Sequence, residues 1–247
     1  MYKYAQTNIQ LYSQLRALNF DINAVELIFK AYELSLELFP SHFRANGRPF
    51  LCHLVGTASI MAEHKFRVEL VAAALLHSVY LFGQFGDPRP GVTERKRKQV
   101  IAAVGEEVES LVMVYTEFPW SRSATGEYAI QFGQMSDRDR EILIMRLANE
   151  LEENLEFEMA YSRKDHLALY EGREDQLRSL ALALVNDEFA VELNAVINPT
   201  QTSTVSERLK RTDRCLFSAV PTPWLHRVVA YLYKKRRKLN KLLFRFK

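Results

Sequence analysis

Apolar residues recur at helical spacing along almost the whole of this 247-residue chain. Residue Asp21 is a favourable N-terminal cap for the clearest such run, residues 21–39. One face of that run carries Val25, Ile28, Phe29, Tyr32, Leu36 and Phe39. Apolar positions three or four residues apart form one face of a helix, and no segment shows the strict alternation of a half-buried strand. The sequence therefore predicts an all-α fold.

Further helices are expected between segments that are rich in turn-forming residues. Their approximate ranges are 6–18, 49–64, 67–82, 93–115, 136–160, 173–197 and 222–245. Gly and Pro mark the breaks between them, at 40–49, 83–91, 119–127, 198–199 and 220–224. Because 198–207 is the loosest segment, we expect a helical domain over residues 1–198, with a core at about 24–160. Residues 199–247 would form a carboxy-terminal appendage.

The basic charge is concentrated at the carboxy-terminal end. Residues 227–247 contain nine basic residues and no acid, so removing them from the formal net charge of +3 leaves −6 for residues 1–226. The longest purely apolar run is Val71–Leu76, which is far too short to span a membrane. The first ten residues are polar, and two distant cysteines form no disulfide framework. We therefore expect a cytoplasmic protein.

Three stretches combine histidines and polar residues in a recurrent order. They read FRANGRPFLCHL from Phe43, VAAALLHSVY from Val71 and ILIMRLANELEEN from Ile142, with GEEVESLV at 105–112 between the last two. Over about residues 24–160 this order resembles the HD superfamily of metal-dependent phosphohydrolases, and within it the RelA/SpoT-type hydrolases of guanosine tetraphosphate. The resemblance implies a helical bundle that binds one or two divalent cations through two histidines and two aspartates.

The sequence keeps both histidines of that pattern and loses both aspartates. His53 and His77 match the family's ligand positions, so the resemblance makes them candidate metal ligands. Ser78 stands where the family has the aspartate after the second histidine, and Asn149 replaces the other aspartate. Neutral oxygens do not supply the charge that holds a divalent cation in a partly buried site, so metal affinity should fall steeply. In having Ser78 after His77, the sequence resembles a group of uncharacterised HD-like bacterial proteins in which serine commonly replaces this aspartate.

Two departures bear on hydrolysis and ligand binding. Leu81 and Phe82 replace the Glu-Asp pair that orients water in the guanosine tetraphosphate hydrolases, and neither can move a proton. We therefore expect no hydrolysis of that kind, and we assign no catalytic residue. Arg44 matches a nucleotide-contacting arginine of the same enzymes.

The acids after Asn149 allow two interpretations. Glu150 or Glu153 could replace the lost charge, because Asn149 and Glu153 lie one helical turn apart. Arg44, Ser78, Asn149, Glu150 and Glu153 are accordingly our candidate ligand-binding residues. Alternatively, Glu150, Glu152, Glu153 and Glu156 form a solvated stripe of an acid-rich helix. The histidines would then be core residues that bond to Ser78, Asn149 or the backbone without a metal.

Residues 224–247 combine apolar residues at helical spacing with the nine basic residues. This pattern is typical of a helix that lies on an anionic membrane surface. The alternatives are a helix packed on the protein's own core or on another acidic partner. Nucleic acid is disfavoured, because no DNA-binding motif accompanies the charge.

Three functions remain open at this point. The first is an HD-like protein whose metal site has become a metal-poor polar pocket for a nucleotide or another small phosphorylated ligand, with a binding or regulatory role. The second is an active HD-family metalloenzyme, a phosphohydrolase or an oxygenase, with rewired ligands. The third is a scaffold at the inner membrane surface.

Overall fold

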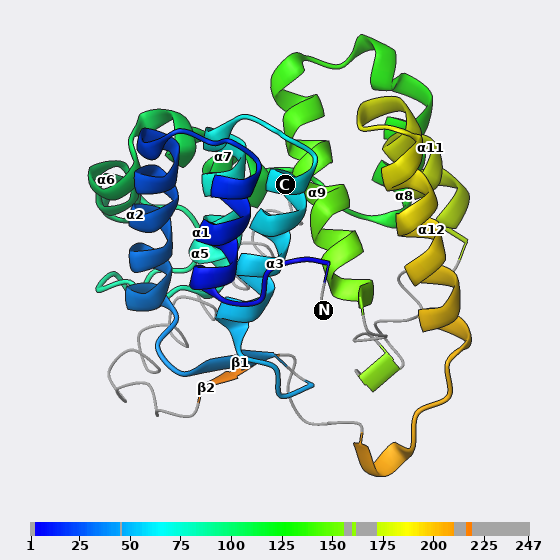
Figure 1. The fold of residues 1–247 in the computed structure, drawn as a ribbon, viewed down its shortest axis with the longest axis horizontal. Helices are drawn as coiled ribbons and strands as arrows, with labels where there is room; N and C mark the ends of the chain where they lie inside the picture. The colour runs from blue at the N-terminus through cyan, green and yellow to red at the C-terminus, as the bar shows by residue number, and fades with distance from the viewer. Residues whose placement is uncertain (1–2, 45, 156–159, 162–171, 210–215, 219–247) are drawn as a thin grey trace, which may run out of the picture.

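The computed structural model describes residues 3–44, 46–155, 160–161, 172–209 and 216–218. Within this part the regular secondary structure is helical apart from one short two-stranded ribbon, which confirms the predicted all-α fold (Figure 1). The first helices are α1 (Asn8–Ala17), α2 (Ile22–Leu38), α3 (Phe50–Glu63), α4 (Val68–Leu76), α5 (Val79–Phe82), α6 (Glu94–Val104) and α7 (Glu106–Glu117). They are followed by α8 (Arg122–Gln131), α9 (Asp137–Asn154), α11 (Glu174–Leu184) and α12 (Asp187–Thr202), with 3₁₀ turns at Phe132–Gln134 and Glu207–Leu209.

Several helices begin at a side chain that caps the first turn. Asp21 accepts a hydrogen bond from the backbone N–H of Ala24 at the start of α2, and Ser136 does the same for Asp139 at the start of α9. Such caps satisfy backbone donors that have no partner inside the helix. The polar residues before each apolar run therefore fix where these helices start.

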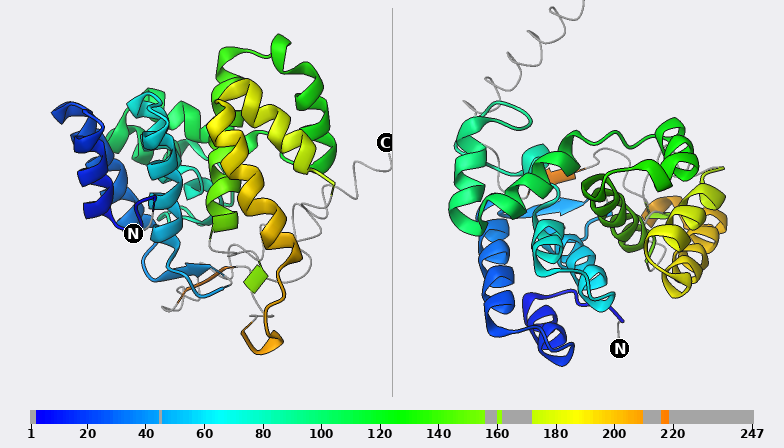
Figure 2. Two further views of the ribbon diagram at one scale, coloured as in Figure 1. Left: turned by 45° about the vertical axis from the view of Figure 1, so that its right-hand side comes forward. Right: turned by 90° about the horizontal axis from the view of Figure 1, so that it is seen from above.

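The core is built around α3 and α4. Every residue from Leu70 to Leu76 is buried, as is most of α3. These two helices pack against each other, with α1 and α9 against α3 and with α2 and α7 against α4. A second group, α8, α11 and α12, packs on the other side of α9 (Figures 1 and 2). Helix α9 thus contacts both groups.

Strand β1 (His42–Arg44) pairs antiparallel with β2 (Leu216–Ser218). The register places His42 opposite Ser218 and Arg44 opposite Leu216. The sequence analysis predicted no strand, because three-residue strands are too short to show an alternating pattern. The ribbon brings a segment near the carboxy-terminal end of the chain to the start of α3.

Four helix boundaries differ from the prediction. The range 67–82 divides at His77 and Ser78, and 93–115 divides at Gly105, whose φ of 87° suits glycine. The range 173–197 divides after Leu184, and the expected break at 119–127 contains the start of α8. The predicted helix 222–245 lies outside the described residues.

The expected break at Asn198 and Pro199 is wrong, because α12 continues to Thr202. A proline in the last turn removes one helical hydrogen bond only. The buried Thr200 hydroxyl is close enough to bond to the carbonyl oxygens of Val196 (2.7 Å) and Asn154 (3.1 Å), which anchors that turn on α9. The division of the chain at residue 198 into a domain and an appendage stays a prediction.

In the part of the chain that the structure describes, no helix combines the length and the apolar character that a membrane span requires.

Candidate functional site

The two histidines of the HD-like pattern meet inside the helical core. His53 lies in the first turn of α3, and His77 directly follows the last residue of α4. Their Nε2 atoms are 3.3 Å apart and their rings are nearly perpendicular, at 80°. Both side chains are buried. Residues 24 positions apart in the sequence thus form one pair.

The end of α4 fixes the tautomer of His77. Its Nδ1 lies 2.8 Å from the backbone carbonyl oxygen of Ala74, one of the carbonyls that a helix end leaves without a helical partner. A ring nitrogen that faces a carbonyl must carry the hydrogen. The Nδ1–H of His77 therefore donates to Ala74, and its Nε2 presents a lone pair to His53.

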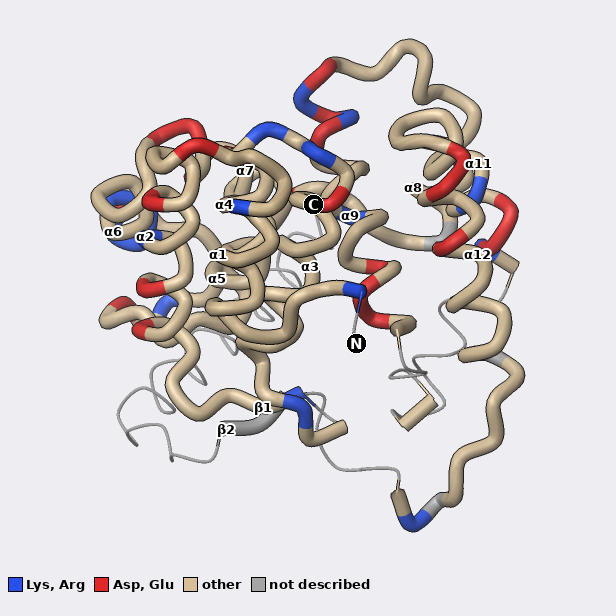
Figure 3. The backbone as a smooth tube through the Cα atoms, viewed as in Figure 1, with Lys and Arg blue, Asp and Glu red and all other residues tan. Residues whose placement is uncertain are grey.

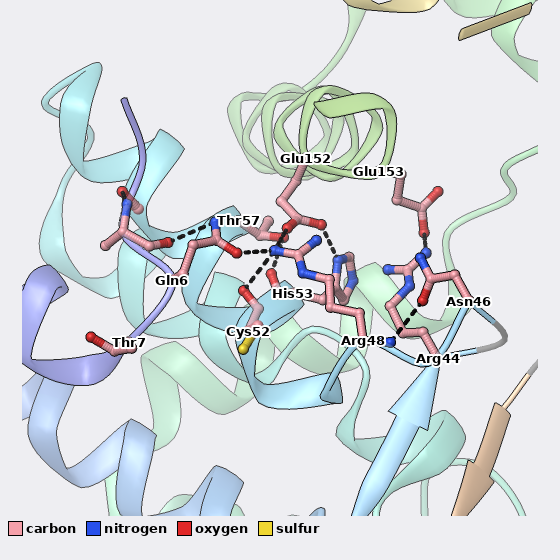
Figure 4. Close-up of polar contacts among 12 residues, drawn as sticks. Gln6, Thr7, Arg44, Asn46, Arg48, Cys52, His53, Thr57, Glu152 and Glu153 are labelled. Atoms are coloured by element: carbon pink, nitrogen blue, oxygen red, sulfur yellow. Dashed lines mark hydrogen bonds and ion pairs between the residues drawn. The ribbon is translucent and has the colours of Figure 1, made fainter. Parts of the chain in front are cut away.

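The carboxylate of Glu152 determines the orientation of His53. Glu152 extends from α9, is fully buried, and contacts His53 Nδ1 through Oε2. Its other oxygen forms an ion pair with Arg48 at 2.5 Å, and Arg48 also contacts the Gln6 side chain and the carbonyl oxygen of Cys52 (Figure 4). The Arg48 guanidinium thus joins the amino-terminal segment, α3 and α9.

A glycine makes room for this carboxylate. A Cβ atom on Gly56 of α3 would lie 2.6 Å from Oε1 of Glu152 and 2.8 Å from its Cγ. Only glycine allows α9 to bring Glu152 this close to α3.

A second arginine and acid lie beside the first pair. Arg44, held by β1, pairs with Glu153 of α9 at 2.9 Å, and both side chains are partly exposed (15% and 21%). Figure 4 shows the two pairs side by side, Arg48 with Glu152 and Arg44 with Glu153. The carboxylates of α9 that face this part of the protein are therefore matched by guanidinium groups.

The two imidazoles are held in their neutral forms. Burial, and to a lesser extent the neighbouring His53, lowers the pKa of His77 to about 3. Burial, with help from Arg44, also holds the pKa of His53 well below its usual range. Burial raises the pKa of the Glu152 carboxyl to about 7, against the opposite effect of Arg48. A neutral histidine pair thus adjoins a carboxyl group that binds a proton near neutral pH.

Glu152, His53 and His77 can form a continuous hydrogen-bonded chain when Glu152 carries a proton. When Glu152 is ionised, it accepts a hydrogen bond from His53 Nδ1–H, and two Nε2 lone pairs then face each other. When Glu152 is protonated, it can donate to Nδ1, and His53 Nε2–H can donate to His77 Nε2. The cluster can therefore satisfy its own hydrogen bonds without a metal.

The residues around the pair do not fit the cation site of the HD family. Two nitrogens bound to one tetrahedral cation at about 2.1 Å lie about 3.4 Å apart, so the pair itself has a suitable spacing. However, no three His, Cys, Asp or Glu residues in the described part of the chain are grouped so that they could hold a metal ion. Glu152 and Glu153 face arginines, and the neutral Ser78 and Asn149 add no charge. A divalent cation here would lack both ligands and compensating charge.

Helix α9 presents a different set of acids to the core than the sequence suggested. The proposed solvated stripe is wrong for Glu150 and Glu152, which are both buried, whereas Glu153 is partly exposed. Glu150 Oε1 accepts a 2.6 Å hydrogen bond from the Trp120 indole N–H, so this oxygen bonds to Trp120 and not to the histidine pair. Glu156 lies outside the described residues.

The sequence analysis therefore missed Glu152 as a site residue. A signal was present, because Met145, Ala148 and Glu152 follow helical spacing and the first two are apolar. An acid in line with apolar residues on one helix face is a candidate for a buried, paired carboxylate.

Ser78 is buried at the start of α5, and Asn149 is partly exposed on α9. The hydrogen bonds of the histidines described above go to Glu152, to each other and to the Ala74 carbonyl. The sequence analysis expected the histidines to bond to Ser78, Asn149 or the backbone. Of these, the structure shows a bond to the backbone, and Glu152 is an additional partner.

Residues 36–119 match the model of a family described as a domain of unknown function, DUF6817. That span contains both histidines, Arg44 and Arg48, but it ends before α9 and Glu152. No curated protein matches the chain.

The buried histidines should make the protein sensitive to acid. An unfolded imidazole binds a proton below pH 6.5, whereas folded His77 stays neutral down to about pH 3, so stability is lost as the pH falls through 6.5. At pH 5 this loss is about 2 kcal/mol for each such histidine. Glu152 acts in the opposite sense. Its raised pKa means that its contribution to stability increases as the pH falls from about 7 to 4.5.

The free energy of unfolding should therefore fall by about 2 kcal/mol less in His77→Gln than in the wild type between pH 7.5 and pH 5, measured by urea denaturation. His64→Gln is the comparison variant, because the His64 ring is only partly buried and burial, the main cause of its lowered pKa, should therefore affect its protonation less. Parallel stability curves for wild type and His77→Gln would show that His77 does not stay neutral.

Proposed function

We propose that this chain is an HD-like protein whose ancestral metal site has become a metal-poor polar pocket for a phosphorylated ligand, with a binding or regulatory role. The observation that carries this proposal is the matching of Arg44 with Glu153 and of Arg48 with Glu152 beside two neutral histidines. A site with two guanidinium groups, two carboxyl groups and no net negative charge does not attract a divalent cation.

The likeness to HD proteins is supported by the spatial proximity of the motif segments as well as by their order in the sequence. The start of α3, the end of α4 and the last turns of α9 meet at one place, as the HD resemblance implies for its two histidines and the helix of its second aspartate. The DUF6817 match neither names an activity nor reaches α9.

Arg44 is the guanidinium group whose carboxylate partner is also open to solvent. It and its partner Glu153 are partly open to solvent, whereas Glu152 is fully buried. Guanidinium groups bind phosphate oxygens in the same bidentate way as carboxylates. A phosphorylated ligand could therefore take the place of Glu153 on Arg44 without disturbing the pair between Arg48 and the fully buried Glu152.

Binding of guanosine tetraphosphate, GDP and pyrophosphate to the full chain, measured by calorimetry, tests this proposal. We expect at least one of these probes to bind, and Arg44→Gln to weaken its binding by about 10- to 100-fold, since one charge-assisted pair is worth about 1.5–3 kcal/mol. Arg16→Gln is the control, because Arg16 is exposed at the end of α1. Failure of all three probes to bind would contradict the proposal.

Metal removal separates this function from a metalloenzyme. We expect purified protein to hold well below one equivalent of metal, and a chelator to leave the melting temperature and the ligand affinity unchanged. Near-stoichiometric metal that is lost in His53→Ala/His77→Ala would overturn the proposal.

One observation favours that second candidate, an HD-family metalloenzyme with rewired ligands. When Glu152 is ionised, both Nδ1 atoms face acceptors, so both Nε2 lone pairs converge at a spacing that one cation could bridge. Ligands beyond the two histidines would have to come from Ser78, Asn149 or rearranged acids of α9.

A further inference from the structure

The outward face of α2 carries an apolar row. Ile22, Phe29 and Leu36 are 69%, 50% and 39% exposed. Residues seven positions apart lie on one line along a helix, so these three side chains form a continuous row over almost the full length of α2. Tyr12 of α1 extends it, with its ring 6.3 Å from that of Phe29. Figures 1 and 2 place α2 at an outer edge of the bundle.

An acidic row runs beside the apolar one. Glu26, Glu33 and Glu37 are all exposed, and none forms a salt bridge with a basic residue of the described ranges. On a helical wheel they lie within about 100° of the apolar row, and Lys30 is the one basic residue of α2. Figure 3 shows acidic positions along this edge. We call the two rows together the α2 face.

The β ribbon holds Leu216–Ser218, the last described residues, beside the segment that follows α2. Ser218 pairs with His42, which follows the last residue of α2 by only four positions. The last described residue, Ser218, therefore lies near the carboxy-terminal end of α2. The five residues from 219 to 223 can span up to about 17 Å, enough to turn back along the helix.

We propose that the α2 face is the docking site for residues 224–247 of the same chain, bound as a helix antiparallel to α2. That segment pairs apolar residues at helical spacing with nine basic residues and no acid, which complements the α2 face in both respects. Its 24 residues would form a helix of about 36 Å, sufficient to cover the roughly 26 Å of α2. The acids of α2 thus hold a segment that would otherwise be available to an anionic membrane surface.

Hydrogen exchange of the full chain, read by mass spectrometry, tests this docking. We expect amides within residues 225–243 to exchange at least 10-fold more slowly in the wild type than in Glu26→Lys/Glu33→Lys/Glu37→Lys. The control is Glu106→Lys/Glu117→Lys/Glu127→Lys, which reverses three exposed acids on α7 and α8 and should keep the protection. Adding Lys234→Glu/Arg237→Glu/Lys241→Glu to the α2 variant should restore it.

Three results would overturn the proposal. The first is a carboxy-terminal segment that exchanges at the unprotected rate in the wild type and gains protection only with phosphatidylserine vesicles, which would indicate a membrane role instead. The second is protection that the α2 variant leaves unchanged. The third is protection that rises with protein concentration, which would assign the docked segment to a second copy of the chain. None of these results bears on the histidine pocket.

Discussion

Arg48→Met should lower the free energy of unfolding by about 3 kcal/mol at pH 8. The substitution leaves the Glu152 carboxylate fully buried with His53 as its remaining described partner, and removal of one member of a buried ion pair strands the other charge. Arg48 also bonds to Gln6 and to the Cys52 carbonyl, so the amino-terminal segment loses an anchor. Chemical denaturation measures the change.

The pH dependence of this loss identifies its cause. Glu152 already has a pKa of about 7, and without Arg48 its pKa should be higher. At pH 5.5 the carboxyl would be protonated in the folded variant, so the destabilisation should shrink to about 1 kcal/mol. The double variant Arg48→Met/Glu152→Gln should recover most of the loss at pH 8.

Arg16→Met provides the control, because Arg16 is exposed in the last turn of α1 and should change stability by less than about 0.5 kcal/mol. A loss for Arg48→Met that is equal at pH 8 and pH 5.5 would show that the stranded charge of Glu152 is not its source.

Gly56→Ala should destabilise the protein by about 1 kcal/mol, and by about 2 kcal/mol at most. Alanine is favoured over glycine within a helix by about 1 kcal/mol, but the new methyl group would lie 2.6 Å from a Glu152 oxygen. His53 and Arg48 hold that carboxylate in a fully buried position, so it cannot move aside without breaking its bonds. Overpacking of this kind typically costs about 1–3 kcal/mol.

Gly126→Ala in α8 is the matched control. Its nearest neighbour is Nε2 at the end of the Gln176 side chain, 3.3 Å from the position of the new Cβ. A flexible side chain can yield, so this variant should be neutral or up to about 1 kcal/mol more stable. In a double-mutant cycle, Gly56→Ala should cost less on a Glu152→Ala background. Equal costs on both backgrounds would exclude the clash with Glu152.

Helix existence was largely predictable from the sequence, whereas helix breaks were not. The spacing in residues 21–39 predicts α2 closely, because an apolar face and an Asp cap act within a few residues. The break between α4 and α5 at His77 and Ser78 is not visible in an apolar run of this kind. It depends on the His77 ring, which bonds back to the Ala74 carbonyl and contacts His53 of another helix.

The candidate site was predicted in part. The pattern around His53 and His77 indicated that two distant histidines meet, and Arg44 was named as a ligand-binding residue. Glu150 was given the same role, which stays a prediction, and one of its oxygens accepts a hydrogen bond from Trp120. Neither Glu152 nor Gly56 was identified, since the importance of each depends on how closely α9 approaches α3.

The sequence by itself determined the all-α class, the start of most helices and the presence of neutral Ser78 and Asn149 where the HD-like pattern has aspartate. These properties follow from local spacing, capping and residue identity, all of which act over a few positions. Only the tertiary structure decided which acid faces His53, which arginine balances it and which face of α2 the other described helices leave uncovered. Those outcomes depend on the packing of helices that lie up to about a hundred residues apart, and a carboxylate on α9 is equally compatible with solvent or core until that packing is known.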